Sequence, residues 1–222
     1  MRLETYPSRE ALMVGLAKVM AAELKAALRE GPATLSVPGG TTPGPVFDAL
    51  AEIDIDWSRV AVVLNDERWV PEDSPRSNTR LLRERLLIKR AAAARVLPIY
   101  AGTAAPEAAL SSLAAGIAPH LPITVLLLGM GNDMHTASLF PGADLLAQAM
   151  SDAAPVVMAL RAAAAGEPRI TLTAPVLRAA AHIHILITGA EKRATLQRAL
   201  QLPVVEAPIA AFLDRATVHW AE

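Results

Sequence analysis

The 222-residue chain contains no cysteine. This absence excludes disulfide bridges, thiolate nucleophiles and sulfur-ligated metal ions, and it suits a reducing compartment. Long apolar runs are also missing, since none approaches the ~18 uninterrupted residues that a membrane span needs. The first ten residues are charged and lack the apolar segment of a secretion signal. We therefore expect a soluble, cytoplasmic protein without a membrane partner.

Excess charge of either sign is missing too, because 21 Lys and Arg residues face 22 Asp and Glu residues. No global field favours nucleic acid, so an anionic ligand must be met by local cations. The five histidines form no spaced cluster of the three or four ligands that zinc requires. We predict no nucleic-acid partner and no metal, and we expect His184 to pack or to form hydrogen bonds.

A linker is the last missing feature. Seventeen prolines and twelve glycines are spread along the chain, and no Ser/Gly-rich segment or block of charge divides it. The 53% hydrophobic content can fill one large core. We therefore predict a single domain over residues 1–222, as a monomer or a small homo-oligomer.

The chain does contain apolar runs that alternate with amphipathic segments. Ser8 is expected to cap a first helix that extends to about residue 29. The alternation predicts an α/β fold with a mostly parallel sheet covered by helices on both faces, and residues 217–220 are expected to close one edge. The predicted strands are residues 33–37, 60–64, 123–128, 156–160, 169–173, 182–188 and 217–220.

One strand leads directly into reactive side chains. Residues 123–128 are apolar, and a Gly-Met-Gly turn then precedes Asp133 and His135. Ligands of open parallel sheets bind beyond the carboxyl ends of the strands. His135 is the candidate catalyst, because an imidazole has an unperturbed pKa of ~6.5 and can take and return a proton near neutral pH. Asp133 either orients His135 or caps the turn, and capping is the more common role for an acid in such a turn.

A glycine pair follows the strand at residues 33–37. Backbone N–H groups of Gly39 and Gly40 can approach an anion closely, and Thr41 or Thr42 can cap the helix that follows. A plain connection between a strand and a helix explains the same residues equally well.

Three charged residues follow the strand at residues 60–64. Burying Asp66, Glu67 and Arg68 is costly unless they reach solvent, pair with each other or meet a ligand. The guanidinium of Arg68 suits a phosphate, although on this segment alone a pair with Asp66 or Glu67 ranks slightly ahead. Asn78, near the next helix start, is normally a cap.

A fourth strand end carries Lys192 in the first turn of a helix that opens at Gly189. A cation is unfavourable at this positive helix end, unless an anion binds there or Glu191 pairs with it. Because these strands are expected to be parallel, one crevice could gather all four strand ends.

Five segments in this order resemble the motifs of the 6-phosphogluconolactonases. The resemblance implies a Rossmann-like fold shared with glucosamine-6-phosphate deaminases and ribose-5-phosphate isomerases. It also implies hydrolysis of 6-phosphoglucono-1,5-lactone to 6-phosphogluconate in the pentose phosphate pathway, without a cofactor. The segments are residues 37–43, 65–71 with 77–78, 129–142, 169–173 and 189–192.

Site residues follow from this resemblance. His135 is expected to activate water with Asp133 beside it, while Arg68, Arg169 and Lys192 bind the phosphate. The other expected substrate contacts are Gly39, Gly40, Thr41, Asp66, Asn78 and Gly131.

Met134 departs from the pattern, because the family usually has glycine between the aspartate and the histidine. If this position has φ > 0, a methionine costs on the order of 1 kcal/mol or more. Its side chain could reorient His135, narrow the pocket or point harmlessly inward.

Two alternatives stay open. The deaminases typically continue after the histidine to Phe-Asn-Glu-Pro, whereas residues 138–141 here are Ser-Leu-Phe-Pro and contain no acid. Ring opening and amine chemistry would therefore lack a carboxylate. The other alternative is a sugar-phosphate binder without activity, in which Met134 disables the loop.

Overall fold

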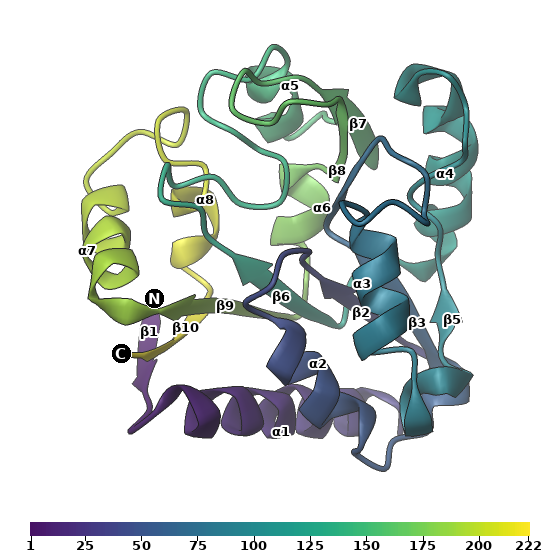
Figure 1. The fold of residues 1–222 in the computed structure, drawn as a ribbon, viewed down its shortest axis with the longest axis vertical. Coiled ribbons are helices and arrows are strands. Elements are labelled where there is room, and N and C mark those ends of the chain that lie inside the picture. Colours follow the sequence, from purple (N-terminus) through teal and green to yellow (C-terminus); the bar gives the residue numbers. More distant parts are fainter.

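The computed structural model describes residues 1–222, and its main sheet has seven strands in the order β1-β10-β9-β6-β2-β3-β5 (Figure 1). All neighbouring strands are parallel, which confirms the predicted parallel sheet. Every residue of β2 and β3 is buried, as expected for a sheet with both faces covered. The strands are β1 (Arg2–Thr5), β2 (Ala33–Val37), β3 (Val60–Leu64), β5 (Arg95–Val96), β6 (Val125–Gly129), β9 (His182–Thr188) and β10 (Thr217–Ala221).

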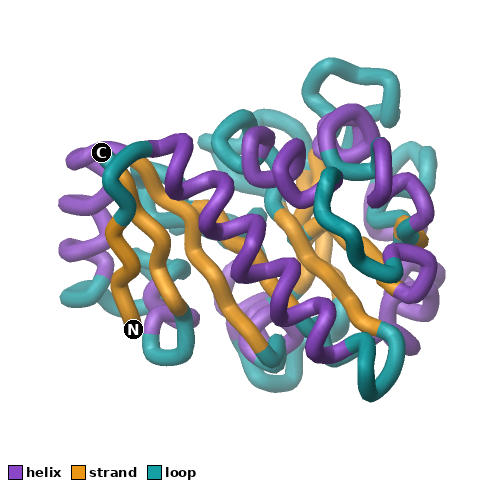
Figure 2. Tube along the Cα trace, turned by 90° about the horizontal axis from the view of Figure 1, so that it is seen from below, coloured by secondary structure: helices purple, strands orange, loops and turns teal.

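Helices cover both faces of this sheet. The longest, α1 (Arg9–Ala27), crosses one face diagonally, and other helices lie behind the strands (Figure 2). Ser8 caps α1 as predicted, since its side chain accepts a hydrogen bond from the N–H of Ala11. The other α-helices are α2 (Gly44–Ala51), α3 (Asn78–Arg85), α4 (Leu110–Ile117), α5 (Leu146–Met150), α6 (Ala174–Arg178), α7 (Gly189–Ala199) and α8 (Ala210–Leu213). Short 3-10 helices are η1 (Trp57–Arg59), η2 (Lys89–Ala93), η3 (Pro106–Ala109) and η4 (Ala118–His120).

A second, antiparallel sheet lies above the main one and has the order β4-β8-β7 (Figure 1). Its strands are β4 (Asp66–Arg68), β7 (Val157–Leu160) and β8 (Arg169–Leu172). β7 and β8 match two predicted strands, but their pairing with the charged residues after β3 was not predicted. The register places Arg68 directly opposite Arg169.

The prediction that residues 217–220 form a sheet edge is wrong. β10 lies between β9 and β1, and β1 forms the outer edge. Only four residues long and largely exposed, β1 carries Arg2 and Glu4 and has no apolar alternation that would mark it as a strand. Charged residues suit an edge strand, because they oppose pairing with another chain.

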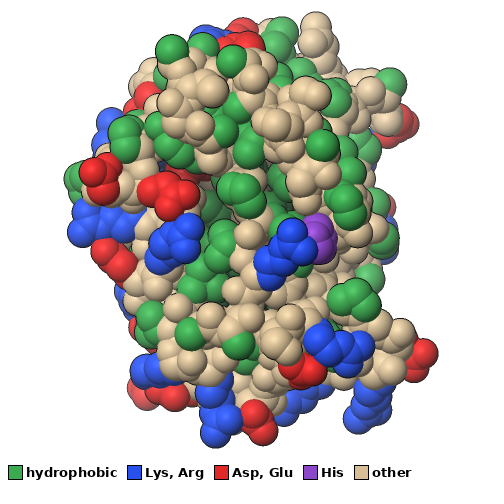
Figure 3. Space-filling view, turned by 90° about the vertical axis from the view of Figure 1, so that its right-hand side faces the viewer, with side chains coloured by type: hydrophobic (Ala, Val, Ile, Leu, Met, Phe, Trp, Pro, Cys, Tyr) green, Lys and Arg blue, Asp and Glu red, His purple; other side chains and the backbone are tan.

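The charged side chains on one face of the molecule are of mixed sign. On the face that carries α4 and β5, basic and acidic side chains lie among each other (Figure 3). No helix combines the length and apolar character needed to cross a membrane.

A partly buried chain of hydrogen bonds connects Tyr6, β10, β9 and α1. Tyr6 Oη lies 2.8 Å from His219 Nδ1, His219 Nε2 lies 3.0 Å from His184 Nδ1, and His184 Nε2 lies 2.7 Å from a carboxylate oxygen of Glu23. The expectation that His184 forms hydrogen bonds is thus confirmed. Burial, with the neighbouring His184, lowers the pKa of His219 to about 3.

We therefore predict that acid destabilises the fold through His219. The native ring stays neutral down to about pH 3, whereas an unfolded imidazole takes up a proton near pH 6.5. Between these values the unfolded state binds more protons, so the free energy of unfolding falls as the pH falls. Urea unfolding at pH 7, 6 and 5 measures this slope.

His219→Gln should flatten the slope by about one proton relative to the unmodified chain. His120→Gln, in the short helix η4, is the matched control and should leave the slope unchanged. Equal slopes for His219→Gln and the unmodified chain would contradict the role of His219.

Candidate active site

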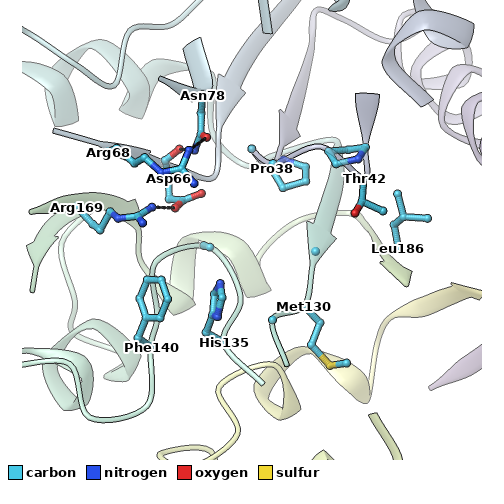
Figure 4. Close-up of a pocket in the computed structure, with 16 residues that line it drawn as sticks. Pro38, Thr42, Asp66, Arg68, Asn78, Met130, His135, Phe140, Arg169 and Leu186 are labelled. Carbon is cyan, nitrogen blue, oxygen red and sulfur yellow. Dashed lines mark hydrogen bonds and ion pairs between the residues drawn. The ribbon is translucent and has the colours of Figure 1, made fainter. Parts of the chain in front are cut away.

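A cavity of about 230 Å³ lies at the carboxyl ends of β2 and β6, and 4 of its 16 lining residues are hydrophobic. This composition suits a strongly polar ligand. Three of the four predicted strand ends contribute to the wall (Figure 4). Thr41, Asp133 and Lys192 do not line the cavity. The predicted site residues that do are Gly39, Gly40, Asp66, Arg68, Asn78, Gly131, His135 and Arg169.

The His135 imidazole is held on one edge and one face. Its Nδ1 lies 2.5 Å from Asp133 Oδ1, which also accepts a hydrogen bond from the His135 backbone N–H at 3.3 Å. Asp133 therefore orients the ring and caps the turn at once. The phenyl ring of Phe140 is stacked on the imidazole at a centroid distance of 4.1 Å. His135 Nε2 has no protein partner.

The negative charge of Asp133 polarises the imidazole of His135. Burial acts to raise the pKa of Asp133, but the hydrogen bond and charge of His135 outweigh it and hold the pKa below its usual value. The carboxylate thus stays ionised, which favours a proton on His135 Nδ1 and leaves Nε2 as the basic nitrogen.

Gly131 gives the imidazole its room. A Cβ atom at this position would collide with His135 Nδ1 and with Asp133 Oδ1. The Gly131 N–H donates to the His135 carbonyl at 2.9 Å, which closes the turn. Only glycine permits so close an approach of ring and backbone.

Met134 has φ 66°, so the expected left-handed conformation is confirmed. Its side chain is half-buried against the hydrophobic core and does not line the cavity, so the inward orientation is the one adopted. Its backbone N–H donates to Gly131, and its carbonyl accepts from Ile209. Strain of about 1 kcal/mol is thus placed outside the cavity.

The alternative that Arg68 merely pairs with Asp66 or Glu67 is wrong. The Arg68 Nη1 donates to Asn78 Oδ1 at 3.1 Å, and the one carboxylate within ion-pair distance is Glu167, at 3.8 Å. Arg68 Nε is buried without a hydrogen-bond partner. The guanidinium is positioned but incompletely satisfied.

The guanidinium of Arg169 also lacks some of its hydrogen-bond partners. It is 8% exposed, its Nη1 lies 3.9 Å from Asp66 Oδ2, and its Nε is buried without a partner. Burial lowers the pKa of Arg169, although the charge of Asp66 offsets part of this effect. Because Arg68 stands opposite Arg169 in the ladder, two like charges lie side by side, which is unfavourable without an anion.

The side chain of Glu67 points away from Arg68 and Arg169 and has a structural role. Its buried carboxylate accepts from the backbone N–H groups of Asn78 and Thr79, the hydroxyl of Thr79 and the hydroxyl of Ser77. Successive residues of a strand point to opposite sides, so Asp66 and Arg68 line the cavity while Glu67 turns to the start of α3.

The expected cap of α3 was assigned one residue too late. Ser77 is the N-cap and accepts from the N–H of Arg80, whereas Asn78 is the first helical residue. The Asn78 side chain is therefore free to donate to the Asp66 carbonyl at 3.0 Å and to accept from Arg68. A Cβ atom at Gly39 would collide with it.

The glycine turn after β2 carries unused donors. Backbone N–H groups of Gly39 and Gly40 donate to no protein acceptor, and Gly40 has φ 86°. The expectation that Thr41 or Thr42 caps α2 is wrong, since Pro43 is the N-cap and no side chain caps the helix.

Lys192 lies behind the turn after β6. Its Nζ donates to the Met130 carbonyl at 2.7 Å, and it forms no ion pair with Glu191. Burial lowers the pKa of Lys192, and nearby Asp133 and Glu191 oppose this shift. In this position Lys192 ties α7 to the turn, and its contact with a phosphate remains a prediction.

Three residues of this site have no role that the sequence predicts. Phe140 and Ser138 lie within residues 129–142, which resemble a family motif, but their side-chain chemistry does not mark them as functional. Ser138 Oγ donates to the carboxylate of Asp66. Glu167 follows Gly166 in a loop with no recognisable motif, so no signal could have identified it.

A polarised imidazole and two under-satisfied arginines at the carboxyl edge of a parallel sheet mark an α/β protein with a candidate site for a small anionic ligand. Residues 7–220 match the model of the family described as Glucosamine-6-phosphate isomerases/6-phosphogluconolactonase. The chain belongs to this family.

Relatives match along nearly the whole chain. A 6-phosphogluconolactonase of Mesorhizobium japonicum is 43% identical over 97% of this chain and 93% of that protein. One of Rhizobium meliloti is 40% identical over 99% of this chain and 98% of that protein. The crystal structure of a 6-phosphogluconolactonase from Shewanella baltica, 33% identical, covers 100% of this chain and 98% of its own, with a TM-score of 0.97. The Rossmann-like α/β fold is thereby confirmed.

The buried carboxylate of Glu67 generates a prediction. Glu67→Ala should lower the free energy of unfolding by about 3 kcal/mol or more, because four donors at the start of α3 lose their acceptor. Chemical denaturation measures the loss. Glu84→Ala, which removes an exposed ion pair of the same helix with Arg80, is the matched control, with an expected change of about 0.5 kcal/mol or less. Comparable losses for both variants would contradict the structural role of Glu67.

Proposed function

We propose that the chain hydrolyses 6-phosphoglucono-1,5-lactone to 6-phosphogluconate, a step of the cytoplasmic pentose phosphate pathway. The observation that carries this proposal is one polar cavity that holds both a polarised imidazole with unpartnered Nε2 and a pair of under-satisfied arginines. Relatives named 6-phosphogluconolactonase over nearly the full chain support it.

In this proposal His135 moves the proton. Water attacks C1 of the lactone while His135 Nε2 accepts a water proton, and a tetrahedral oxyanion forms. When the bond between C1 and the ring oxygen breaks, the imidazolium returns the proton to that oxygen. The new carboxylic acid then ionises. Asp133 accepts the hydrogen bond from His135 Nδ1 and stabilises the positive charge of the imidazolium.

Backbone donors would stabilise the oxyanion. The N–H groups of Gly39 and Gly40 have no protein acceptor, whereas that of Gly131 is already bonded to the His135 carbonyl. Fixed donors of this kind are effective because they need no reorganisation as charge develops. We therefore assign the oxyanion or the adjacent sugar oxygens to the Gly39-Gly40 turn.

The phosphate belongs beside Arg68 and Arg169 in the same proposal. An anion there would neutralise two adjacent like charges and give partners to their buried Nε atoms. Asn78, which accepts from Arg68, fixes the guanidinium that would donate. Binding energy gained at this end holds the lactone carbonyl close to the base.

An isomerase or deaminase activity fits the site less well. That chemistry needs a carboxylate after the histidine, and the residues here are Ser138, Leu139 and Phe140. Ser138 donates its hydroxyl to Asp66 instead, and Phe140 covers the imidazole. A lactone requires less assistance, because its carbonyl carbon is already electrophilic.

The direct test is an assay of lactone loss coupled to oxidation of 6-phosphogluconate, with a control without enzyme because the lactone hydrolyses unaided. We expect saturable acceleration above the spontaneous rate. Binding of 6-phosphogluconate without acceleration would instead identify a non-catalytic binder. Conversion of glucosamine 6-phosphate would identify the deaminase alternative.

His135→Ala should lower kcat by roughly 10²–10⁴, because general acid-base catalysis contributes about that much. Steady-state kinetics against the lactone measures the change, and circular dichroism verifies the fold. His120→Ala, at the opposite end of the strands, is the control and should keep full activity. Undiminished turnover in His135→Ala would remove His135 from the mechanism.

Arg68→Ala should raise KM by about tenfold or more, since hydrogen bonds to charged groups are worth about 1.5–3 kcal/mol each. Arg80→Ala, on the exposed side of α3, should leave KM unchanged. Unchanged saturation together with a fall in turnover would show that Arg68 does not bind the phosphate.

A further inference from the structure

We propose that Phe140 is a positioning residue that sets the plane of the His135 imidazole. The inference rests on the proposed function, in which His135 is the base. Phe140 is 6% exposed and lies in the wall of the cavity, with its ring beside that of His135 (Figure 4). The two ring planes differ by 27°.

The hydrogen bond to Asp133 leaves one degree of freedom unfixed. A single contact from Nδ1 to Oδ1 fixes one edge of the imidazole but allows the ring to tilt about that contact. Gly131 limits this motion from the Nδ1 side by close approach of its backbone. A stacked face is what fixes the plane, and the plane decides where Nε2 points.

The phenyl ring is itself firmly held. Leu139 N–H donates to the Thr136 carbonyl at 3.0 Å, which makes a tight turn immediately before Phe140. Ser138 anchors this turn, because its hydroxyl donates to Asp66 and its N–H donates to Thr171 Oγ1 at 3.3 Å. A ring on so constrained a backbone can act as a rigid support.

Phe140 also faces the charge that His135 acquires. When water is deprotonated the imidazole becomes a cation, and an aromatic face attracts a cation more strongly where water is excluded. The guanidinium of Arg169, with its Cζ 5.6 Å from the phenyl centroid, lies near the same ring. One aromatic side chain therefore contacts both the proposed base and the proposed phosphate ligand.

The simpler explanation is that Phe140 only fills the core, as Phe47 does with no exposed surface. Leucine in place of a filler lowers stability and leaves catalysis unchanged. Leucine in place of a positioning residue lowers kcat, because a misplacement of about 1 Å can cost about 10²-fold in rate. The two explanations therefore differ in a measurable quantity.

The experiment compares Phe140→Leu, Phe140→Tyr and Phe47→Leu in the full chain. We expect Phe140→Leu to lower kcat by about 10- to 100-fold with little change in KM. Phe140→Tyr, which keeps the aromatic face, should restore most of the activity. Phe47→Leu should lower stability alone. Unchanged kcat in Phe140→Leu, or a change in KM alone, would overturn the proposal, the latter because Phe140 would then act on Arg169.

A double-mutant cycle tests whether Phe140 acts through His135. In a His135→Gln background, Phe140→Leu should cause little further loss, because the ring that it positions is gone. Multiplicative losses would overturn the proposal. The NMR signals of the His135 ring protons give a readout independent of activity: their upfield shift from the stacked phenyl ring should vanish in Phe140→Leu, and an unchanged shift would also overturn it.

These outcomes separate the two proposals. Lactone loss no faster than the spontaneous rate with the unmodified chain would overturn the proposed function itself. Full activity in His135→Gln would overturn the role of His135 as the base, and with it the positioning role of Phe140. An inactive His135→Gln together with a fully active Phe140→Leu would overturn only the positioning role of Phe140.

Discussion

A parallel sheet sends the carboxyl end of every strand to the same edge, and the site depends on this constraint. The turn after β2, the charged residues after β3 and the Gly-Met-Gly turn after β6 are far apart in sequence. Because the strands lie next to each other in the order β6-β2-β3, these three segments meet at one cavity. The candidate catalytic and binding residues are thus brought together by backbone pairing, before any side chain contributes.

The small antiparallel sheet adds what the parallel sheet alone would lack. β8 brings Arg169, which is distant in sequence, to the position opposite Arg68. The carboxylates of Glu167 and Asp66 lie within 4 Å of these two guanidinium groups and offset part of the repulsion between them, although neither carboxylate accepts a hydrogen bond from them. Each arginine of the pair thus has a carboxylate nearby but no close ion pair with it. Closer carboxylates would satisfy the arginines and reduce their attraction for an anion, so the incomplete compensation suits the proposed phosphate ligand.

Sequence patterns revealed those parts of the fold that depend on apolar runs. The strands β3 and β6 are such runs, and β2 and β9 are rich in apolar residues. The three residues of β4 and the four of β1 are largely charged, and a strand there is identified only by the partner strand beside it. The same limit applies to the site. Residues 66–68 suggested a ligand site from their charge, but only their alternation on β4 separates Glu67 from the cavity.

Met134 illustrates how a departure from a pattern is absorbed. A left-handed residue with a side chain costs about 1 kcal/mol relative to glycine, and this cost falls on the stability of the fold. Part of it is offset, because the side chain packs against the core and the carbonyl accepts a hydrogen bond from Ile209. The imidazole of His135 keeps its contacts with Asp133 and Phe140 on the other side of the turn. Met134 therefore leaves the imidazole in place, and a non-catalytic binder in which Met134 disables the loop has no structural support.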